Sequence, residues 1–291
     1  MPAEPPSPND APLVTVGIPT YNRPEGLRRT LAHIVGQTYR NLDIVVSDNC
    51  SPGEATAQVV EEFRRQDPRI RYFRQPENQG AAFNFTFVME QARARYFIWA
   101  ADDDWFESDD LIARLAALVQ APGGLLAFPD VNIVHDDRGP VRVRRMQAVF
   151  GRCRTDYEYL VAWCHYGAGY PVYGLYDRER MADGGLAFAF EPDLAYFNEG
   201  LFLHRIFLAG GARFAGDVSY NFSRSRAGVL ARLGPAEVRR SFRAYAGRVL
   251  RFYWRSRLPW PRKIRILNIL FWKYLRYYLK LLRRRAPAAP D

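Results

Sequence analysis

Short apolar runs that resemble β-strands alternate with helix-like stretches four times between residues 13 and 119. The first run is rich in β-branched residues, and the stretch after it carries Leu27, Leu31 and Ile34 at helical spacing. Short connections between strands and helices in this order favour a parallel sheet with helices on both faces. We therefore predict an α/β fold, with strands at residues 13–19, 42–47, 70–73 and 96–101.

The pattern changes after residue 124. Two strands joined by a hairpin are expected first, and helices and shorter strand-like pieces follow them. In order, the strands are expected at 125–134 and 141–150, then a helix at 157–164, a strand-like piece at 171–176, a helix at 198–208 and a strand at 218–222. Two more helices are expected at 237–257 and 261–285, split by a Pro-Trp-Pro sequence.

Three consecutive carboxylates, those of Asp102, Asp103 and Asp104, follow the apolar run that ends at residue 101. Like charges repel, and burying them is costly unless a cation compensates them. Mg²⁺ or Mn²⁺ suits this role, because such ions take one or two carboxylates together with substrate phosphates. The position also suits a site, since ligands of open α/β sheets bind at the carboxyl ends of the strands. The alternative is a solvated acidic turn before the next helix, with Ser108 or Asp109 as its N-cap.

Four motifs lie in order within the first 118 residues, and together they resemble the family 2 glycosyltransferases of GT-A fold. They are Val-Gly-Ile-Pro-Thr-Tyr-Asn-Arg at 16–23, Ile-Val-Val-Ser-Asp-Asn at 44–49, Glu-Asn-Gln-Gly-Ala-Ala-Phe-Asn at 77–84 and Ala-Asp-Asp-Asp-Trp at 101–105. The resemblance implies a Rossmann-like, mostly parallel sheet, a nucleotide-diphosphate-sugar donor and a transfer that inverts the anomeric centre. It is weaker between residues 125 and 222.

The resemblance also implies a set of donor-binding residues. Pro19, Thr20 and Tyr21 would hold the base, and Asp48 would accept a hydrogen bond from an N–H of a pyrimidine. An Asx-turn is the alternative role for Asp48. The expected nucleotide-sugar set is completed by Arg23, Asn78, Gly80, Asn84, Asp102 and Asp103. A solvated helix start is the alternative for Arg23, and helix capping is the alternative for Asn78.

By the same resemblance, Asp102 reaches the ribose or the metal and Asp104 coordinates the metal. The cation would stabilise the leaving diphosphate. Inversion also needs a base that deprotonates the acceptor hydroxyl. Glu199 stands at the position that matches the family's base, and Asp193 is the second candidate. Either acid could instead be a helix-start charge that the helix dipole favours.

The positive charge of the chain is concentrated at its C-terminal end. Residues 232–291 contain 17 Lys or Arg and two acids, which gives 17 − 2 = +15, whereas the remainder has 24 − 29 = −5. The last expected helix contains too many charges to span a membrane. It is basic, amphipathic and rich in aromatic residues, a pattern that suits a helix lying in the membrane interface. The alternative is that its apolar face packs on the catalytic domain or on a second subunit. No recognised nucleic-acid-binding motif accompanies it, so no nucleic-acid partner is expected.

These observations predict a disordered, Pro-rich leader at 1–12, a catalytic domain at 13–230 with a nucleotide-sugar half (13–120) and an acceptor half (121–230), and a basic helical tail at 231–291. Three cysteines without metal-like spacing favour a reducing compartment. No signal peptide is expected. We therefore predict a cytoplasmic enzyme that is bound peripherally to the inner face of the plasma membrane. A homo-oligomer is compatible with the sequence.

The expected function is metal-dependent, inverting sugar transfer in cell-envelope polysaccharide synthesis. The donor would be a nucleotide-diphosphate sugar, and the acceptor would be a glycan or a lipid-linked molecule. The alternative from another class is a catalytically silent domain that binds glycans or membrane as a scaffold.

Overall fold

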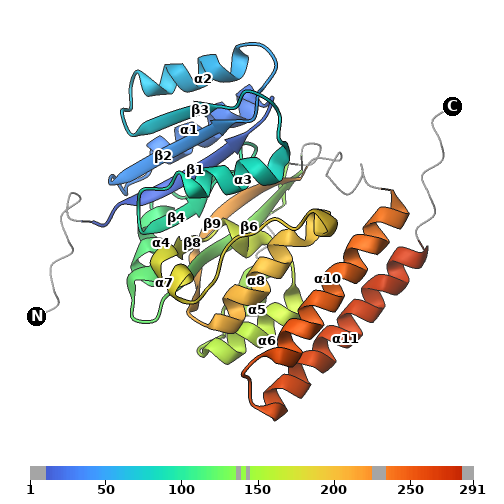
Figure 1. The fold of residues 1–291 in the computed structure, drawn as a ribbon. Helices are drawn as coiled ribbons and strands as arrows, with labels where there is room; N and C mark the ends of the chain where they lie inside the picture. Colours follow the sequence, from blue (N-terminus) through green and yellow to red (C-terminus); the bar gives the residue numbers. More distant parts are fainter. Residues whose placement is uncertain (1–10, 136–138, 142–144, 225–233, 284–291) are drawn as a thin grey trace, which may run out of the picture. The chain divides into compact units, whose positions relative to one another are not determined.

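The computed structural model describes residues 11–135, 139–141, 145–224 and 234–283 (Figure 1). Contacts divide the chain into two compact units: residues 1–152, 170–188 and 211–223 form unit 1, and residues 153–169, 189–210 and 224–291 form unit 2. This division does not follow the predicted domain boundaries, which remain a prediction. The predicted leader falls mostly on residues 1–10, outside the described residues.

Unit 1 is built on one sheet with the strand order β3-β2-β1-β4-β8-β6-β9-β5, and β7 pairs with β6. The four strands predicted from the first half are present and parallel: β1 (Val14–Thr20), β2 (Leu42–Asp48), β3 (Ile70–Arg74) and β4 (Tyr96–Trp99). The other strands are β5 (Trp105–Phe106), β6 (Leu126–His135), β7 (Gly139–Val141), β8 (Leu175–Asp177) and β9 (Ala212–Arg224). β8 runs antiparallel to both β4 and β6, so the sheet is mixed.

Helices cover both faces of the parallel part of this sheet. Val16 and Ile18 of β1 face a core shared with α1 (Pro24–Val35), α2 (Ala55–Arg64) and α4 (Leu111–Gln120). Gly17, between them, faces the opposite layer, where Val88 of α3 (Gly80–Glu90) lies so close that a Cβ at residue 17 would overlap it. Successive side chains of a strand point to opposite faces, so a strand buried in both layers is apolar at most of its positions. This confirms the predicted α/β architecture with helices on both faces (Figure 1).

The register of the parallel strands determines which residues meet at one edge. Thr20 pairs with Asp48, and Val14 pairs with both Leu42 and Tyr96. β4 ends at Trp99, three residues before the aspartate triplet begins. Parallel strands all finish at the same edge. The ends of β1, β2 and β4 therefore bring their following residues together.

Two predicted strands of the second half are wrong in part. The predicted hairpin exists between β6 and β7, but its second strand ends at Val141 and helix α5 occupies Arg145–Phe150. Met146 and Phe150 are both fully buried and lie four residues apart, which is helical spacing and overrides the Val-Arg alternation before them. The piece at 171–176 is a 3₁₀ turn, Tyr170–Tyr173, followed by β8, because Pro171 has no N–H for a sheet ladder. Helix α7 follows β8 and covers Arg178–Asp183.

Unit 2 is helical. It contains α6 (Asp156–Tyr166), a 3₁₀ turn (Pro192–Phe197), α8 (Asn198–Ala209), α10 (Pro235–Arg255) and α11 (Trp260–Arg283). Thr155 and Glu158 form a capping box at the start of α6, and Gly167 ends that helix with a left-handed φ of 62°. These helices match the predicted ones at 157–164, 198–208, 237–257 and 261–285 to within a few residues. No described helix combines the length and apolar character that a membrane span needs.

A buried histidine of α8 contacts three other helices of unit 2. His204 of α8 accepts a hydrogen bond at Nδ1 from the Trp163 indole of α6 (3.1 Å). Its Nε2 lies 3.2 Å from the hydroxyls of both Tyr245 of α10 and Tyr274 of α11. Since Nδ1 is the acceptor, the proton of the neutral ring belongs on Nε2. Burial lowers the pKa of His204 well below its ordinary value, which keeps the ring neutral.

The two C-terminal helices are therefore integral to unit 2. Ile266, Leu270, Tyr274 and Leu281 of α11 are all buried, and Lys273 donates to the carbonyl of Cys164 at the end of α6 (2.8 Å). These four residues belong to the apolar side of the helix, for which the sequence left contact with the membrane or packing on the protein open. In the structure, that face packs within the unit, as in the alternative considered for the tail.

Candidate donor and catalytic site

Asp102 lies where the ends of β1 and β4 meet. Its Oδ2 accepts hydrogen bonds from the Thr20 hydroxyl (2.8 Å) and from the Tyr21 backbone N–H (3.2 Å). Its Oδ1 accepts one from the Arg23 guanidinium (2.9 Å). The strand ends thus bring four of the predicted donor-site residues into direct contact.

The other two aspartates of the triplet face different partners. Asp103 Oδ2 accepts a hydrogen bond from the same Arg23 nitrogen (2.8 Å), and its side chain is about one third exposed. Asp104 is buried, with Oδ2 on the Tyr220 hydroxyl (2.9 Å) and Oδ1 on the Ser223 backbone N–H (2.7 Å). Tyr220 and Ser223 belong to β9, and nothing in the sequence motifs indicated them.

The electrostatics of the triplet favour a cation. Burial raises the pKa of Asp102, and the Arg23 charge opposes that shift. Burial, reinforced by the neighbouring Asp103 charge, raises the pKa of Asp104 well above its ordinary value. Burial and the charge of Asp102 also raise the pKa of Asp103. One guanidinium is thus shared by two of three crowded carboxylates, and a further positive charge would stabilise all three in their ionised form.

Helix α1 holds the backbone of the triplet from one side. A Cβ at Gly26 would overlap the carbonyl oxygen of Asp102, so only glycine allows the helix to come this close. Arg29 donates to the carbonyl of the second aspartate (2.9 Å), and Thr30 donates to that of the third (2.7 Å). Arg29 and Thr30 are three and four positions after Gly26, so the three residues lie on one face of α1. Sequence reasoning missed all three residues, whose types carry no signal without the fold.

Asp48, at the end of β2, is fully buried. Its Oδ1 accepts from the Ser51 N–H (2.8 Å), which is the turn contact considered as the alternative role. Its Oδ2 accepts from the Tyr72 hydroxyl (3.0 Å), and the Arg74 guanidinium lies 3.9 Å away. Tyr72 was not predicted as a site residue. A carboxylate has about four acceptor lone pairs, so Asp48 retains capacity for a ligand N–H.

Asn84 of α3 bridges the ends of β1 and β2. Its Nδ2 donates to the carbonyls of Thr20 (3.2 Å) and Ser47 (2.8 Å), whereas its buried Oδ1 has no hydrogen-bond partner among the described residues. A buried acceptor without a donor is costly. A ligand N–H or O–H would satisfy it.

The remaining predicted donor residues form the rim of this edge. Asn78 Oδ1 accepts from the Asn49 side chain and from the Gly80 N–H, both at 2.9 Å. Asn78 thus precedes Gln79, the N-cap residue of α3, and holds the first N–H of that helix. Gly80 has a left-handed φ of 85°, which favours glycine there. Pro19 is buried in β1, and the side chain of Tyr21 is exposed.

A divalent cation fits this acidic edge only with help from a ligand. Among the described residues, no group of three or more His, Cys, Asp or Glu could hold a metal alone. Mg²⁺ usually takes one or two carboxylates and completes its shell with water and substrate phosphates. Asp102 and Asp104, the predicted metal residues, each keep acceptor lone pairs beyond their present hydrogen bonds.

The two candidate bases belong to unit 2 and differ in their environments. Glu199 lies in the first turn of α8 beside Gly169, and burial raises the pKa of its carboxyl to about 7. Asp193 is exposed and paired with Arg248 at 2.9 and 3.1 Å. The Arg248 hydrogen bonds lower its pKa. The two candidates therefore differ: the pKa of the Glu199 carboxyl is raised, whereas the Asp193 carboxylate is stabilised in its ionised form.

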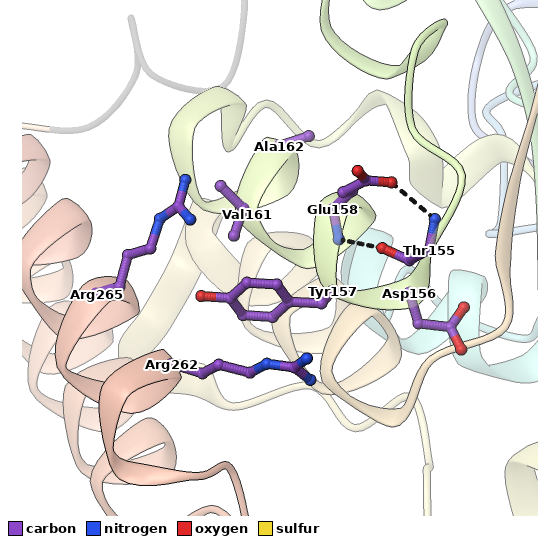
Figure 2. A pocket seen from close by; sticks show the side chains of 8 residues that line it. All are labelled: Thr155, Asp156, Tyr157, Glu158, Val161, Ala162, Arg262 and Arg265. Carbon is purple, nitrogen blue, oxygen red and sulfur yellow. Dashed lines mark hydrogen bonds between the residues drawn. The ribbon is translucent and has the colours of Figure 1, made fainter.

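A recess of about 650 Å³ opens elsewhere in unit 2, between α6 and α11 (Figure 2). The Arg262 guanidinium lies 4.5 Å from the centre of the Tyr157 ring. Arg265 extends from the same helix on the other side of the recess, and the Glu158 carboxylate points away toward the Thr155 backbone (Figure 2). None of these residues belongs to the predicted site.

Residues 15–179 match the model of the family described as glycosyl transferase family 2. A putative teichuronic acid biosynthesis glycosyltransferase, TuaG of Bacillus subtilis, is 28% identical over 133 residues, which are 46% of this chain and 52% of that protein. The chain spans about half or less of the length of the first curated relatives it matches.

Two solved structures have the same fold. TarS residues 1–349 of S. aureus in complex with UDP-GlcNAc has a TM-score of 0.73 at 16% identity, covering 92% of this chain and 74% of that one. The mannosyltransferase PcManGT of Pyrobaculum calidifontis, in complex with GDP-Man and Mn²⁺, has a TM-score of 0.66 at 17% identity, covering 95% and 75%.

Proposed function

Because the chain belongs to glycosyl transferase family 2, we propose that it transfers a sugar from a nucleotide-diphosphate-sugar donor to a glycan or lipid-linked acceptor. Membership confirms the predicted family. The likeness to TarS and PcManGT supports the GT-A fold expected from the sequence. The identity of the donor, metal dependence and inversion belong to the proposal.

One observation carries the proposal: hydrogen-bonding side chains from separate elements meet at the carboxyl edge of β1, β2 and β4. Thr20 contacts Asp102 directly, and Asn84 links the ends of β1 and β2 while leaving one buried acceptor unsatisfied. Asp48 supplies a second buried acceptor. A nucleotide offers N–H groups on its base and O–H groups on its ribose, so this edge suits the nucleoside part of the donor.

The acidic triplet would serve the diphosphate through a divalent cation. We propose Asp102 and Asp104 as the residues that hold the cation, with Asp103 and Arg23 beside them. When bound, the cation would supply Lewis-acid stabilisation of the leaving diphosphate. The mannosyltransferase crystallised with Mn²⁺ supports this assignment by analogy of fold. Arg23 pairs with two of the carboxylates through one guanidinium, which would be free to turn toward phosphate oxygens once a metal replaced it.

Glu199 is the proposed general base. A base works best when its pKa lies near the operating pH, and burial raises the pKa of Glu199 to about 7. Its Oε atoms would accept the proton of the acceptor hydroxyl as the new glycosidic bond forms. Asp193 is the weaker candidate, because its pair with Arg248 stabilises the ionised form and lowers its basicity.

We place the reaction in cell-envelope polysaccharide synthesis, at the inner face of the plasma membrane. The relative named for teichuronic acid biosynthesis supports the pathway class. The basic helix α11 supports attachment to a membrane surface.

Thermal unfolding with a panel of UDP-, GDP- and CDP-sugars, each with Mn²⁺ or with EDTA, tests the proposal. A donor at 100 times its dissociation constant should stabilise the protein by about 2.7 kcal/mol. Asp48→Asn should remove most of this shift. Asp110→Asn is the matched control, since Asp110 lies on the surface of unit 1 and, among the described residues, its carboxylate pairs with the exposed Arg114. If no nucleotide sugar shifts the transition or releases nucleoside diphosphate, the chain is a silent domain and the proposal fails.

A further inference from the structure

Helix α11 has a second apolar face, which is exposed. Ile264 is 62% exposed, Phe271 53% and Leu282 54%. At 3.6 residues per turn, these positions share one side of the helix with Leu275, opposite the face that Ile266 and Leu270 bury. One apolar side of α11 is therefore buried and the other is exposed to solvent. Contiguous exposed apolar surface is uncommon on soluble proteins and marks sites of interaction with proteins or membranes.

Basic residues border this exposed face. Trp272 and Leu279, which are 49% and 46% exposed, follow the apolar side around the helix. The exposed side chains of Arg262, Arg265, Arg276 and Lys280 come next on the wheel. Apolar, aromatic and basic residues therefore form adjacent stripes along the whole length of α11.

The turn between α10 and α11 extends the same surface. Trp254 and Trp260 are each 59% exposed, and their rings lie in an edge-on arrangement with centroids 5.7 Å apart. Lys263 fixes the turn, because its Nζ donates to the carbonyl of Trp254 (3.0 Å) and lies over the Trp260 ring. Tryptophans held in this way are typical of protein surfaces at the boundary between headgroups and acyl chains.

We propose that this surface, defined by Trp254, Trp260, Ile264, Phe271, Trp272, Leu275, Leu279 and Leu282 with the flanking Arg262, Arg265, Arg276 and Lys280, inserts into an anionic lipid surface. The assignment deepens the membrane attachment named above and specifies which face of the helix carries it. Charge complementarity selects lipid over a second copy of the chain, because two copies of one basic stripe would repel each other across a dimer interface.

The recess between α6 and α11 fits this orientation. Arg262 and Arg265 border it, and the Tyr157 hydroxyl points between them (Figure 2). When α11 lies in the interface plane, both guanidinium groups are at headgroup depth, where they can donate to lipid phosphates. Asp156 and Glu158 also line the recess. The Glu158 carboxylate is turned away from the two guanidinium groups, toward the backbone N–H groups of Arg154 and Thr155, which donate to it (Figure 2).

Vesicle flotation of the full chain tests the proposal, using phosphatidylcholine vesicles with or without phosphatidylglycerol. Wild-type protein should float with the anionic vesicles at low salt, and added salt should weaken binding. Phe271→Ser/Trp272→Ser and Arg265→Glu/Arg276→Glu should each lower the partition coefficient at least tenfold. Phe190→Ser is the matched control, because Phe190 is a comparably exposed aromatic (41%) outside α11, and it should bind as wild type does.

Two results would overturn the proposal. One is binding that neither double variant reduces relative to Phe190→Ser. The other is a wild-type chain that does not float with anionic vesicles at low salt. If that chain sediments as a dimer and Phe271→Ser/Trp272→Ser dissociates it, the surface is a subunit interface instead. Thermal unfolding followed by circular dichroism is the control that each variant is folded. The flotation assay contains no sugar donor, so a chain that does not bind vesicles says nothing against the proposed transfer reaction. A chain without transfer activity likewise says nothing against lipid binding by this surface.

Discussion

Glu199→Gln should make the protein more stable and less active at the same time. The side chain lies at the start of α8, is only partly exposed, and burial raises the pKa of its carboxyl from 4.5 to about 7. Glutamine keeps the size and removes the charge that burial disfavours. If Glu199 is the base, the substitution also removes the group that takes the acceptor proton.

The pKa gives the expected size of the stability change. A rise of 7 − 4.5 = 2.5 pKa units corresponds to about 3 kcal/mol at about 1.4 kcal/mol per unit. This is an upper figure, because the side chain keeps some contact with solvent. Since the folded-state pKa is raised, the folded protein binds more protons than the unfolded chain between pH 4.5 and 7, and the wild type loses stability as the pH rises through that window. The advantage of the variant should thus be absent below pH 4.5 and complete above pH 7.

Urea unfolding of both proteins at several pH values measures this difference directly. Steady-state transfer should fall about 10²- to 10⁴-fold in the variant, the usual contribution of a general base, with donor affinity nearly unchanged. Wild-type turnover should rise with pH as Glu199 ionises near pH 7. Asp193→Asn serves as the control, because the lowered pKa of Asp193 predicts a loss of stability at neutral pH rather than a gain.

The reasoning is refuted by a Glu199→Gln protein with wild-type turnover, or by a stability difference that does not depend on pH. If Asp193→Asn instead loses turnover while Glu199→Gln keeps it, Asp193 is the base and the proposed role of Glu199 is wrong.

Two further predictions concern the acidic triplet and the C-terminal helices. Asp104→Ala should abolish transfer and metal-dependent nucleotide binding, and should cost about 1–3 kcal/mol of unfolding free energy because the buried Tyr220 hydroxyl loses its acceptor; near wild-type turnover, or a wild type indifferent to chelators, would contradict this. Deleting residues 262–291 should abolish cooperative unfolding of unit 2, since His204 loses Tyr274 and the buried face of α11; limited proteolysis that leaves α8 protected would show instead that the helix is dispensable.

The sequence predicted the first half of the fold well and the second half less well, for a physical reason. β1, β2 and β4 are buried on both faces, so their sequences are mostly apolar and hard to mistake for surface strands. The stretch at 141–150 carries a two-residue alternation followed by a four-residue spacing, and only the packing of Met146 and Phe150 decides where strand gives way to helix.

The candidate site shows the same limit. Asp48 and Asp102 could be found because both stand at the ends of predicted strands and within the motifs that carry the family resemblance. Tyr72, Tyr220 and Ser223 could not, because they reach these carboxylates from strands whose pairing the local sequence does not reveal. The orientation of α11 was likewise ambiguous, since it is apolar on two sides and only the tertiary structure shows which side is buried.

The close fit of α1 against the acidic triplet has a thermodynamic consequence for donor binding. With Gly26 touching one carbonyl and Arg29 and Thr30 bound to the next two, the backbone of the triplet is held at each residue before any ligand arrives. Fixing the backbone of one loop residue costs about 1–2 kcal/mol of conformational entropy, and here folding has already met that cost. The binding energy of the donor can therefore be used for orientation and for the departing diphosphate, without first having to order the loop that receives it.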